Sequence, residues 1–215
     1  MTVKFVCLAN SFKEGGRCLA GIVLNNNNIP IMEAGHPKWI RPISHSPHGE
    51  VSTHLVSHLE IMDIVEIDVT EYPNSGNYQS ENAIFRENSI RVVGNYSVTQ
   101  LGALCDNRNL IFGNKGKAVC EDAIGNLNYS LMLIRTDNFE VVEKVYEDTN
   151  RPQVRLVFSF NDHQYDFPIT DPVFLHQYQL NADVLEDQNV LYLSLSLAVV
   201  WKEWYYKLVA GIIQA

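Results

Sequence analysis

The feature that most constrains this chain is a period-two alternation of apolar and polar residues. Residues 61–69 show it most clearly, with apolar side chains on one face and Asp63 as the charged exception on that face. Such alternation is typical of half-buried β-strands, so Asp63 is expected either to start the strand or to have a specific role. Further strands are expected at residues 3–8, 18–24, 38–43, 78–85, 90–93, 131–135, 139–146, 154–160, 164–169, 190–197 and 205–213.

Helical signals are few by comparison. Ser97 to Gln100 has the capping-box pattern, which predicts a helix that ends near Asp106. Asp171 followed by Pro172 predicts a second, short helix, because Asp is a good capping residue and Pro fits the first helical position. Many strands with only one or two short helices exclude an α/β fold and predict an all-β class.

The order of the predicted elements indicates how the chain is divided. The strands fall into two sets, one before and one after the helical region. Two OB-like barrels of about five strands each, packed together, fit this count, because an OB-fold is a five-stranded, partly open barrel. We expect a first barrel at 1–95, a helical connection at 96–125 and a second barrel at 126–215. A single β-sandwich is the competing architecture.

The charge of the chain bears on the class of its partner. It carries 16 Lys and Arg against 25 Asp and Glu, a formal net charge of −9. Nucleic-acid-binding proteins usually present a basic surface, which the overall field of this chain opposes. The distribution is uneven, and a local basic groove therefore stays open. Basic residues outnumber acidic ones by five to two in 1–44 and four to one in 89–119, but number one to eight in 45–88 and four to thirteen in 120–189.

Cysteine usage and the absence of targeting signals indicate a cytoplasmic protein. The 4 cysteines are widely separated, with no C-x-x-C pair, and are expected to be buried thiols in a reducing compartment. No apolar run approaches the roughly 20 residues of a membrane helix. The N-terminus lacks the basic and apolar segments of a secretory signal. We therefore expect no membrane partner.

No sequence motif for catalysis is present. The chain lacks a Walker A loop, a G-x-S-x-G elbow, H-E-x-x-H and G-x-G-x-x-G. A histidine-rich segment between His36 and His58 leaves open a metal-assisted hydrolase that also uses Asp63 or Glu66. Loop histidines are the simpler interpretation, because no carboxylate has a diagnostic spacing from them. We assign no catalytic residue, no metal ligand and no cofactor.

One strand carries the strongest candidate for ligand binding. Trp39 and Arg41 are two residues apart, which places an indole and a guanidinium on the same strand face. Such a pair could stack on a base while the guanidinium binds a phosphate or a guanine edge. The alternative is that Arg41 pairs with Asp63 or Glu66 across the sheet while Trp39 fills the core.

Two other groups of polar residues accompany this pair. Lys13 and Arg17 flank a turn that contains two glycines, and Gln79 and Asn82 lie at a strand entry where amides could read a base edge. Capping of a turn is an equal alternative for the second group. The predicted ligand-binding residues are Lys13, Arg17, Trp39, Arg41, Ser44, Gln79, Glu81, Asn82 and Lys207.

Several of these segments, in this order, resemble the bacterial dual OB-containing domain family over nearly the full chain. The resemblance implies two OB-like barrels and a cytoplasmic bacterial protein from a defence-related gene neighbourhood, and it implies no activity. The chain departs from the family pattern at 198–204, where a Gly-containing turn is expected; this departure is expected to expose Trp201 or Trp204. The matching segments are Ser11-x-Lys13 with Gly16-Arg17-Cys18-x-Ala20-Gly21, Trp39 to Ser44, Met62 to Val65, Gln79-x-Glu81-Asn82, Thr170-Asp171-Pro172, and Tyr206 to Ile213.

Three function classes stay open from the sequence. The first is a non-catalytic module that binds single-stranded nucleic acid or a nucleotide in a groove lined by Lys13, Arg17, Trp39 and Arg41. The second is the metal-assisted hydrolase, and the third is a scaffold that binds a protein partner through a sheet edge. We favour the binding module, because the pairing of an aromatic ring with a cation supports it and no catalytic motif supports an enzyme.

Overall fold

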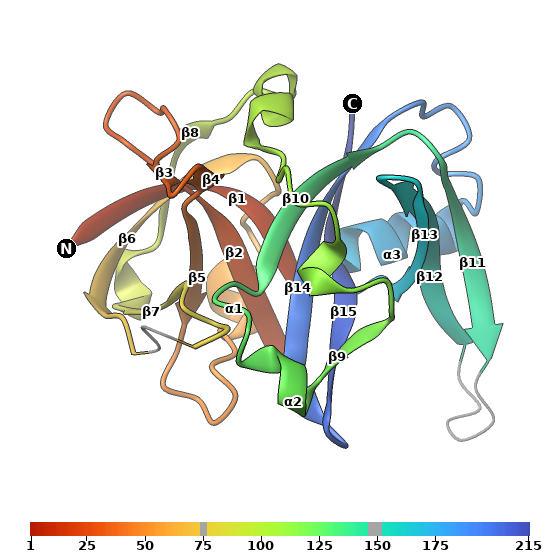
Figure 1. The fold of residues 1–215 in the computed structure, drawn as a ribbon. Coiled ribbons are helices and arrows are strands. Elements are labelled where there is room, and N and C mark those ends of the chain that lie inside the picture. Colours follow the sequence, from red (N-terminus) through yellow and green to blue (C-terminus); the bar gives the residue numbers. More distant parts are fainter. Residues whose placement is uncertain (74–76, 146–151) are drawn as a thin grey trace.

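The structure is a computed structural model that describes residues 1–73, 77–145 and 152–215. It has two β-rich halves, which lie side by side in Figure 1. The first half contains β1 (Thr2–Lys13), β2 (Gly16–Leu24), β3 (Met32–Glu33), β4 (His36–Pro37), β5 (Trp39–Ile43), α1 (Thr53–Val56), β6 (Asp63–Glu71), β7 (Asn82–Phe85) and β8 (Arg91–Asn95). The second half contains β9 (Ala118–Cys120), α2 (Glu121–Ile124), β10 (Leu131–Thr136), β11 (Phe139–Val145), β12 (Pro152–Phe160), β13 (His163–Pro168), α3 (Pro172–Leu180), β14 (Leu191–Trp201) and β15 (Trp204–Gln214).

The first half is a closed barrel. Its strands follow the order β1-β2-β5-β7-β6-β8, and β1 also pairs with β6, so that β1, β2, β5, β7 and β6 form a ring. Apolar residues that alternate along these strands fill the interior, among them Phe5, Leu19, Ile40, Val65 and Phe85. Strand β8 extends the sheet from β6 outside the ring. We call this ring the barrel.

The second half is an open half-barrel. It consists of a sheet in the order β10-β14-β15-β9 and a second sheet in the order β11-β12-β13. The two sheets enclose a separate core that includes Phe158, Phe167, Leu193 and Val209. The predicted all-β class with two OB-like barrels is therefore confirmed, with the second barrel left open. The proposed boundaries 1–95, 96–125 and 126–215 stay a prediction.

Two of the local predictions agree with the structure and one does not. Asp63 starts β6, and its carboxylate accepts the backbone N–H of Glu60 at 2.8 Å. Asp171 caps α3 by accepting the N–H groups of Val173 and Phe174. The capping box at Ser97 does not form: residues Val98–Leu104 are a 3₁₀ helix, and the side chain of Ser97 at its N-cap makes no cap hydrogen bond. The remaining 3₁₀ turns are Glu87–Ser89 and Ile111–Gly113.

Strand positions follow the alternation, but several ends are shifted, and the strand expected at 3–8 continues to Lys13. The strand expected at 78–85 is shorter and begins at Asn82, whereas the strand expected at 190–197 continues to Trp201. The strand expected at 139–146 is β11, and its last position, 146, lies outside the described residues. Within the part of the chain that the structure describes, no helix is both long and apolar enough to cross a membrane.

The barrel and the half-barrel pack directly against each other. Val6, Leu8 and Ile22 of the barrel share one apolar cluster with Leu133 of β10 and Ile213 of β15. The approach is close enough to exclude a side chain, since a Cβ added at Gly211 would lie 2.3 Å from the carbonyl oxygen of Leu8. Glycine is therefore required at this crossing of β15 over β1.

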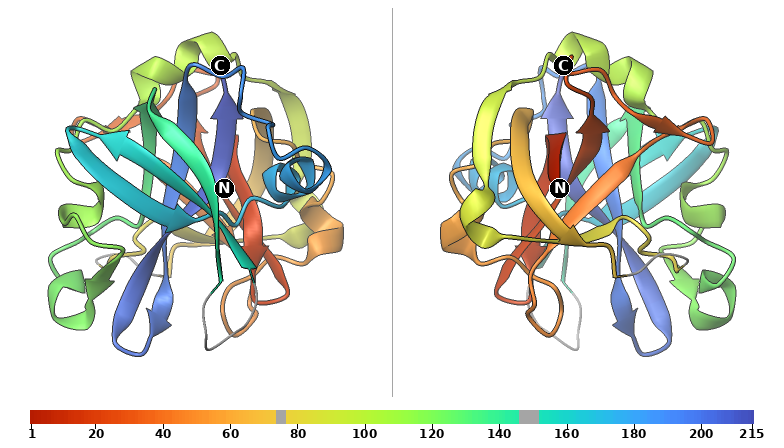
Figure 2. Two further views of the ribbon diagram at one scale, coloured as in Figure 1. Left: turned by 90° about the vertical axis from the view of Figure 1, so that its right-hand side faces the viewer. Right: turned by 90° about the vertical axis from the view of Figure 1, so that its left-hand side faces the viewer.

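The β14–β15 hairpin projects from the half-barrel, and Figure 2 shows its tip at the lower end of the molecule from both sides. Its two-residue turn places Lys202 and Glu203 at positive φ, as a tight hairpin turn requires. The residues on either side of the turn, Trp201 and Trp204, are both exposed. The sequence-based expectation of an exposed indole in this segment is confirmed.

Candidate functional site

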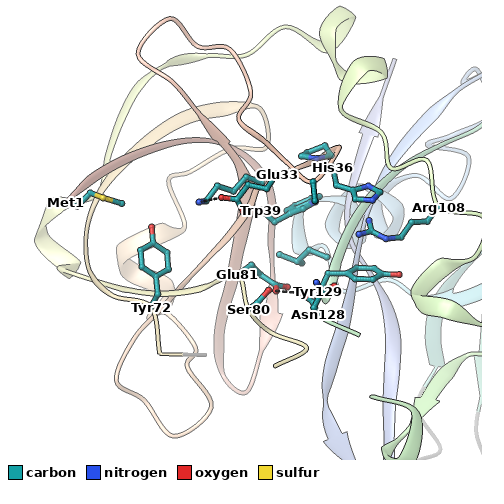
Figure 3. A pocket seen from close by; sticks show the side chains of 14 residues that line it. Met1, Glu33, His36, Trp39, Tyr72, Ser80, Glu81, Arg108, Asn128 and Tyr129 are labelled. Carbon is teal, nitrogen blue, oxygen red and sulfur yellow. Dashed lines mark hydrogen bonds and ion pairs between the residues drawn. The ribbon is translucent and has the colours of Figure 1, made fainter. Parts of the chain in front are cut away.

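A groove of about 520 Å³ lies between the barrel and the half-barrel. The barrel contributes the β3–β4 hairpin, the start of β5 and the segment before β7, and the half-barrel side contributes residues that precede and begin β10 (Figure 3). Its size falls in the range of small-molecule sites, roughly 300–1,000 Å³. The lining residues are Met1, Glu33, Ala34, His36, Pro37, Lys38, Trp39, Tyr72, Ser80, Glu81, Arg108, Asn128, Tyr129 and Leu131.

Trp39 is the aromatic side chain that the barrel contributes to the groove. It is the first residue of β5 and is half-buried. One part of its indole packs against a small cluster formed by Ala9, Ala20, Leu131 and Ala210. The alternative in which Trp39 simply fills the core is thus only half right, because the side chain both packs on the interface and lines the groove.

Arg108 and Tyr129 form the opposite wall. The guanidinium carbon of Arg108 lies 3.8 Å from the centroid of the Tyr129 ring, which is a cation–π contact. Arg108 also binds the carboxylate of Asp106, so its plane is held in place from two directions. Burial raises the pKa of the Tyr129 hydroxyl, which stays neutral at ordinary pH and can donate a hydrogen bond. Figure 3 shows this pair on the half-barrel side of the groove.

The cations of the groove are balanced by nearby acids. Lys38 binds Glu33 at 2.5 Å, and Arg108 pairs with Asp106. The imidazole of His36 lies 3.9 Å from the same Asp106 carboxylate. The groove is therefore close to neutral rather than strongly basic. Its walls carry the flat rings of Trp39 and Tyr129. This character suits the face of a base better than a run of phosphates.

Arg41, which the sequence places on the same strand face as Trp39, is buried. Only 1% of it is exposed, and its guanidinium reaches Glu81 at 3.6 Å, Asn82 at 3.4 Å and Ser196 of β14 at 3.3 Å. The alternative prediction that Arg41 pairs with Asp63 or Glu66 is wrong. The parallel pairing of β5 with β7 brings the Glu81 segment beside Arg41 instead. Arg41 thus joins the barrel to the half-barrel.

Glu81 is the acid on which this junction depends. Its Oε1 accepts from the backbone N–H of Ser130 at 3.1 Å and also from the Ser130 hydroxyl. Asn82 and Gln79 are linked by a side-chain hydrogen bond of 3.3 Å on the same segment. The structure therefore brings Arg41, Glu81, Asn82 and Gln79 together, and of these four Glu81 lines the groove.

Lys207, also predicted to bind a ligand, is fully buried in the half-barrel. Its ammonium donates to the carbonyl oxygens of Ile111 and Asn114, both at 2.7 Å, and to the Asn114 side chain at 3.0 Å. The rings of Tyr165 and Phe167 lie 5.8 Å away. These contacts hold the Ile111–Gly113 turn in place, so we do not include Lys207 in the candidate site.

The other three predicted residues lie outside the groove. Lys13 ends β1 with a pKa lowered mainly by burial, and Ser44 donates to the carbonyl of Glu50 at 2.5 Å. Arg17 stacks over the exposed Phe12 ring at 4.7 Å. Of the nine predicted ligand-binding residues, Trp39 and Glu81 line the groove.

Sequence reasoning did not single out Arg108 or Tyr129. Each lies in a segment without regular strand or helix, far from Trp39 along the chain. A signal was present for the near wall, since His36 and Lys38 lie just before Trp39 in the sequence. No local pattern connects the two walls, because they meet only through packing of the two halves.

The histidine-rich segment does not form a metal centre in the described parts of the chain. Across 1–73, 77–145 and 152–215, no group of three or more His, Cys, Asp and Glu side chains is placed to hold one ion. His36 is at the groove, and the ring of His54 contacts the Ser52 hydroxyl at 2.7 Å. The hydrolase alternative stays a prediction.

Comparison with known families agrees with this architecture. The model of the dual OB-containing domain family matches residues 3–212. The chain belongs to the dual OB-containing domain family. In this member the two OB-like units are the barrel and the half-barrel, and the groove lies between them. No curated protein matches the sequence.

Solved structures with similar folds are distant from this dual OB-containing chain. A replication protein A heterotrimer bound to ssDNA matches at 12% identity and a TM-score of 0.38, covering 92% of this chain and 44% of that one, so this chain spans less than half of its length. A murine DNA-binding protein bound with dsDNA matches at 8% identity and a TM-score of 0.40, covering 100% of this chain and 95% of that one. The p204 HINb domain matches at 11% identity and a TM-score of 0.40, covering 99% of this chain and 96% of that one.

Proposed function

We propose that this chain is a non-catalytic module that binds single-stranded nucleic acid by stacking a base in the groove between its two OB-like units. The observation that supports this proposal is the pairing of Trp39 on one wall with the stacked Arg108 and Tyr129 on the other. Aromatic and guanidinium planes bind the faces of bases, each stacked base contributing about 1–3 kcal/mol. Trp39 is kept from the sequence-based site, and Arg108 and Tyr129 replace Lys13, Arg17 and Arg41.

The near-neutral groove predicts how this binding depends on salt. Because Lys38 and Arg108 are already paired with acids, few counterions would be released from the nucleic acid when it binds. For single strands, the logarithm of the binding constant falls with the logarithm of the salt concentration, with a slope of about −0.7 for each phosphate neutralised. We expect a slope no steeper than about −1.5, measured by anisotropy of a labelled oligonucleotide over a series of salt concentrations.

The chain offers its own reporter for the groove. It has 3 tryptophans, and Trp201 and Trp204 are at the distant hairpin, so a W201F/W204F variant leaves Trp39 as the single indole. Titration with oligonucleotides of about 6 nucleotides should change Trp39 emission, since a base stacked on the indole alters its environment. Tyr129→Ala in the same background should weaken binding at least roughly fivefold.

Arg17→Met is the matched control for this titration. Arg17 also stacks on an aromatic ring, that of Phe12, but it is not among the residues that line the groove. The control should bind the oligonucleotides as the parent does. Unchanged Trp39 emission at low salt and at oligonucleotide concentrations near millimolar would contradict the proposed function. The cytoplasmic, bacterial and defence settings implied by the family resemblance stay predictions.

A further inference from the structure

One acid in the wall of the groove has an oxygen without a hydrogen-bond partner. Of the described residues that line the groove, two carry a carboxylate, Glu33 and Glu81. Glu33 is exposed and binds Lys38. Glu81 is only 7% exposed, and in the part of the chain that the structure describes its Oε2 has no hydrogen-bond partner. The groove wall therefore contains a buried acceptor that the protein itself leaves unused.

The other oxygen of Glu81 fixes the carboxylate in place. Oε1 accepts from the backbone N–H of Ser130 at 3.1 Å and from the Ser130 hydroxyl, and it lies 3.6 Å from the Arg41 guanidinium. The Glu81 carbonyl oxygen accepts the backbone N–H of Arg41 at 2.8 Å, two residues after Trp39 on β5. Glu81 is thus held from several directions on the barrel side of the groove, as Trp39 is (Figure 3).

A buried carboxylate oxygen without a donor is energetically costly. An ionised carboxyl group only accepts hydrogen bonds, and burial removes the water that would otherwise donate to it. An unpartnered polar atom of this kind calls for an explanation, and in a binding site a donor on the ligand supplies one. A base that stacks between Trp39 and Tyr129 turns its polar edge toward the remaining walls of the groove. Glu81 is one of the residues that this edge meets.

The pattern of donors on the edge of a base determines how well the base suits an acceptor. Guanine carries two adjacent donors on its Watson–Crick edge, the N1–H and the N2 amino group. Thymine carries one N–H between two carbonyl oxygens, which a carboxylate repels. Cytosine and adenine carry an amino group beside an acceptor nitrogen and are intermediate. A carboxylate therefore ranks guanine first and thymine last.

We infer that Glu81 selects the base that stacks in the groove, and that the preferred base is guanine. The inference rests on the proposed function, since it assumes that a base enters between Trp39 and Tyr129. A hydrogen bond to a charged group, when it is lost, typically weakens binding by about tenfold or more. Guanine in the groove should therefore bind at least about tenfold more tightly than thymine.

Oligonucleotides that carry a single base test this preference without ambiguity of register. Each has about 6 nucleotides, all of them abasic except a central guanine, cytosine, adenine or thymine. The W201F/W204F protein reports each titration through Trp39, and the affinity is taken from the midpoint rather than from the amplitude. The guanine oligonucleotide should bind most tightly and the thymine oligonucleotide least tightly.

Glu81→Gln in this background separates recognition of the base from a structural role. The amide oxygen of glutamine can keep the bonds to Ser130, which turns the NH₂ group, a donor, to the place of Oε2. The ratio of guanine to thymine affinity should then fall to about one or below, since thymine offers carbonyl acceptors. A purely structural role would weaken all four oligonucleotides equally and leave the ratio unchanged.

Two further variants complete the test. R41M/E81Q also removes the Arg41 charge, so it keeps the ratio measurable if Glu81→Gln alone does not fold, and its ratio should fall in the same way. Glu66→Gln is the matched control, because Glu66 pairs with Arg91 and is not among the residues that line the groove. This control should keep the guanine preference of the parent.

The outcomes separate this inference from the proposed function. If Trp39 emission responds to neither the single-base nor the unmodified oligonucleotides, the proposed function is wrong and the inference fails with it. A response to the unmodified ones alone, or equal affinity for all four bases, would overturn only the inference. Equal affinity would mean that Oε2 is satisfied by water or by the Nε of Arg41, which also has no partner among the described residues. A guanine preference that survives Glu81→Gln would likewise overturn the assignment to Glu81.

Discussion

Two regions of the molecule bury a cation, and they do so in different ways. Between the barrel and the half-barrel, Arg41 faces the carboxylate of Glu81 and two neutral side chains. Inside the half-barrel, the hydrogen bonds of the Lys207 ammonium go to neutral oxygens of Ile111 and Asn114. The first cation joins two halves of the chain through an ion pair, whereas the second fixes a loop within one half.

The difference is visible in the protonation of Lys207. Burial without a matching negative charge disfavours the charged form and lowers its pKa to about 7. An arginine stays protonated in proteins and therefore needs a carboxylate when it is buried. Replacement of Arg41 should therefore lower the free energy of unfolding more than replacement of Lys207 does, because it leaves the Glu81 carboxylate buried without a cation.

The largest effect is expected from Arg41→Ala. This change leaves the Glu81 carboxylate buried without its cation, which typically costs about 3–5 kcal/mol. Urea unfolding followed by circular dichroism would measure the loss. The double variant R41M/E81Q removes both charges, keeps an oxygen for Ser130, and should lose less than R41M alone. A loss below about 1 kcal/mol for Arg41→Ala would show that the pair is not effectively buried.

Lys207→Met should be destabilising by about 1–3 kcal/mol in the same assay. Methionine fills similar space but leaves the carbonyl oxygens of Ile111 and Asn114 without a donor. The turn at Ile111–Gly113, where Phe112 has a φ of 47°, should become more open to proteolysis. A fully stable K207M protein would show that water replaces the ammonium at this turn.

These two predictions also show what the sequence could and could not establish. Alternation placed Trp39 and Arg41 on the same strand face, and in the structure both reach the half-barrel, where Trp39 packs on Leu131 and Arg41 contacts Ser196. It could not show that the half-barrel would cover Arg41 and leave Trp39 partly open. Depth of burial depends on which distant element packs on a face, and local spacing holds no information on that.

Elements governed by local rules were easier to predict than the site. Asp171 before Pro172 marked α3 because capping involves only adjacent residues. The groove needed Arg108 and Tyr129 to meet Trp39, and that meeting depends on how two halves dock. The β5–β7 pairing, which replaced Asp63 with Glu81 as the partner of Arg41, likewise joins segments far apart in the sequence.

The pH dependence of stability should sharpen the contrast between the two cations. Because the Lys207 pKa falls from the usual lysine value of 10.5 to about 7 on folding, the unfolded chain holds up to one more proton than the folded chain between about pH 7 and pH 10.5. Stability of the wild type should then rise relative to K207M by up to about 1.4 kcal/mol per pH unit from about pH 7 to pH 10.5, and should not change below or above this range. An equal pH profile for both proteins would show that Lys207 stays charged.

The smallest effect is expected from Lys38→Met at the rim of the groove. Its ion pair with Glu33 has side chains that are 35% and 61% exposed, so solvent screens it. Exposed pairs of this kind contribute less than about 1 kcal/mol, and the melting temperature should hardly change. A loss as large as that of Arg41→Ala would mean that burial does not explain the difference between the cations.

The contact between Gly211 and the Leu8 carbonyl has a consequence for how the groove works. Main chain touches main chain where β15 crosses β1, so neither strand has room to pivot on the other. Trp39 stands on β5, which is joined to β1 through β2, and Tyr129 lies just before β10, which is joined to β15 through β14. The separation of the two walls is therefore set by this crossing before any ligand arrives. We therefore expect entry into a preformed slot, with association kinetics in a single phase and no closing step.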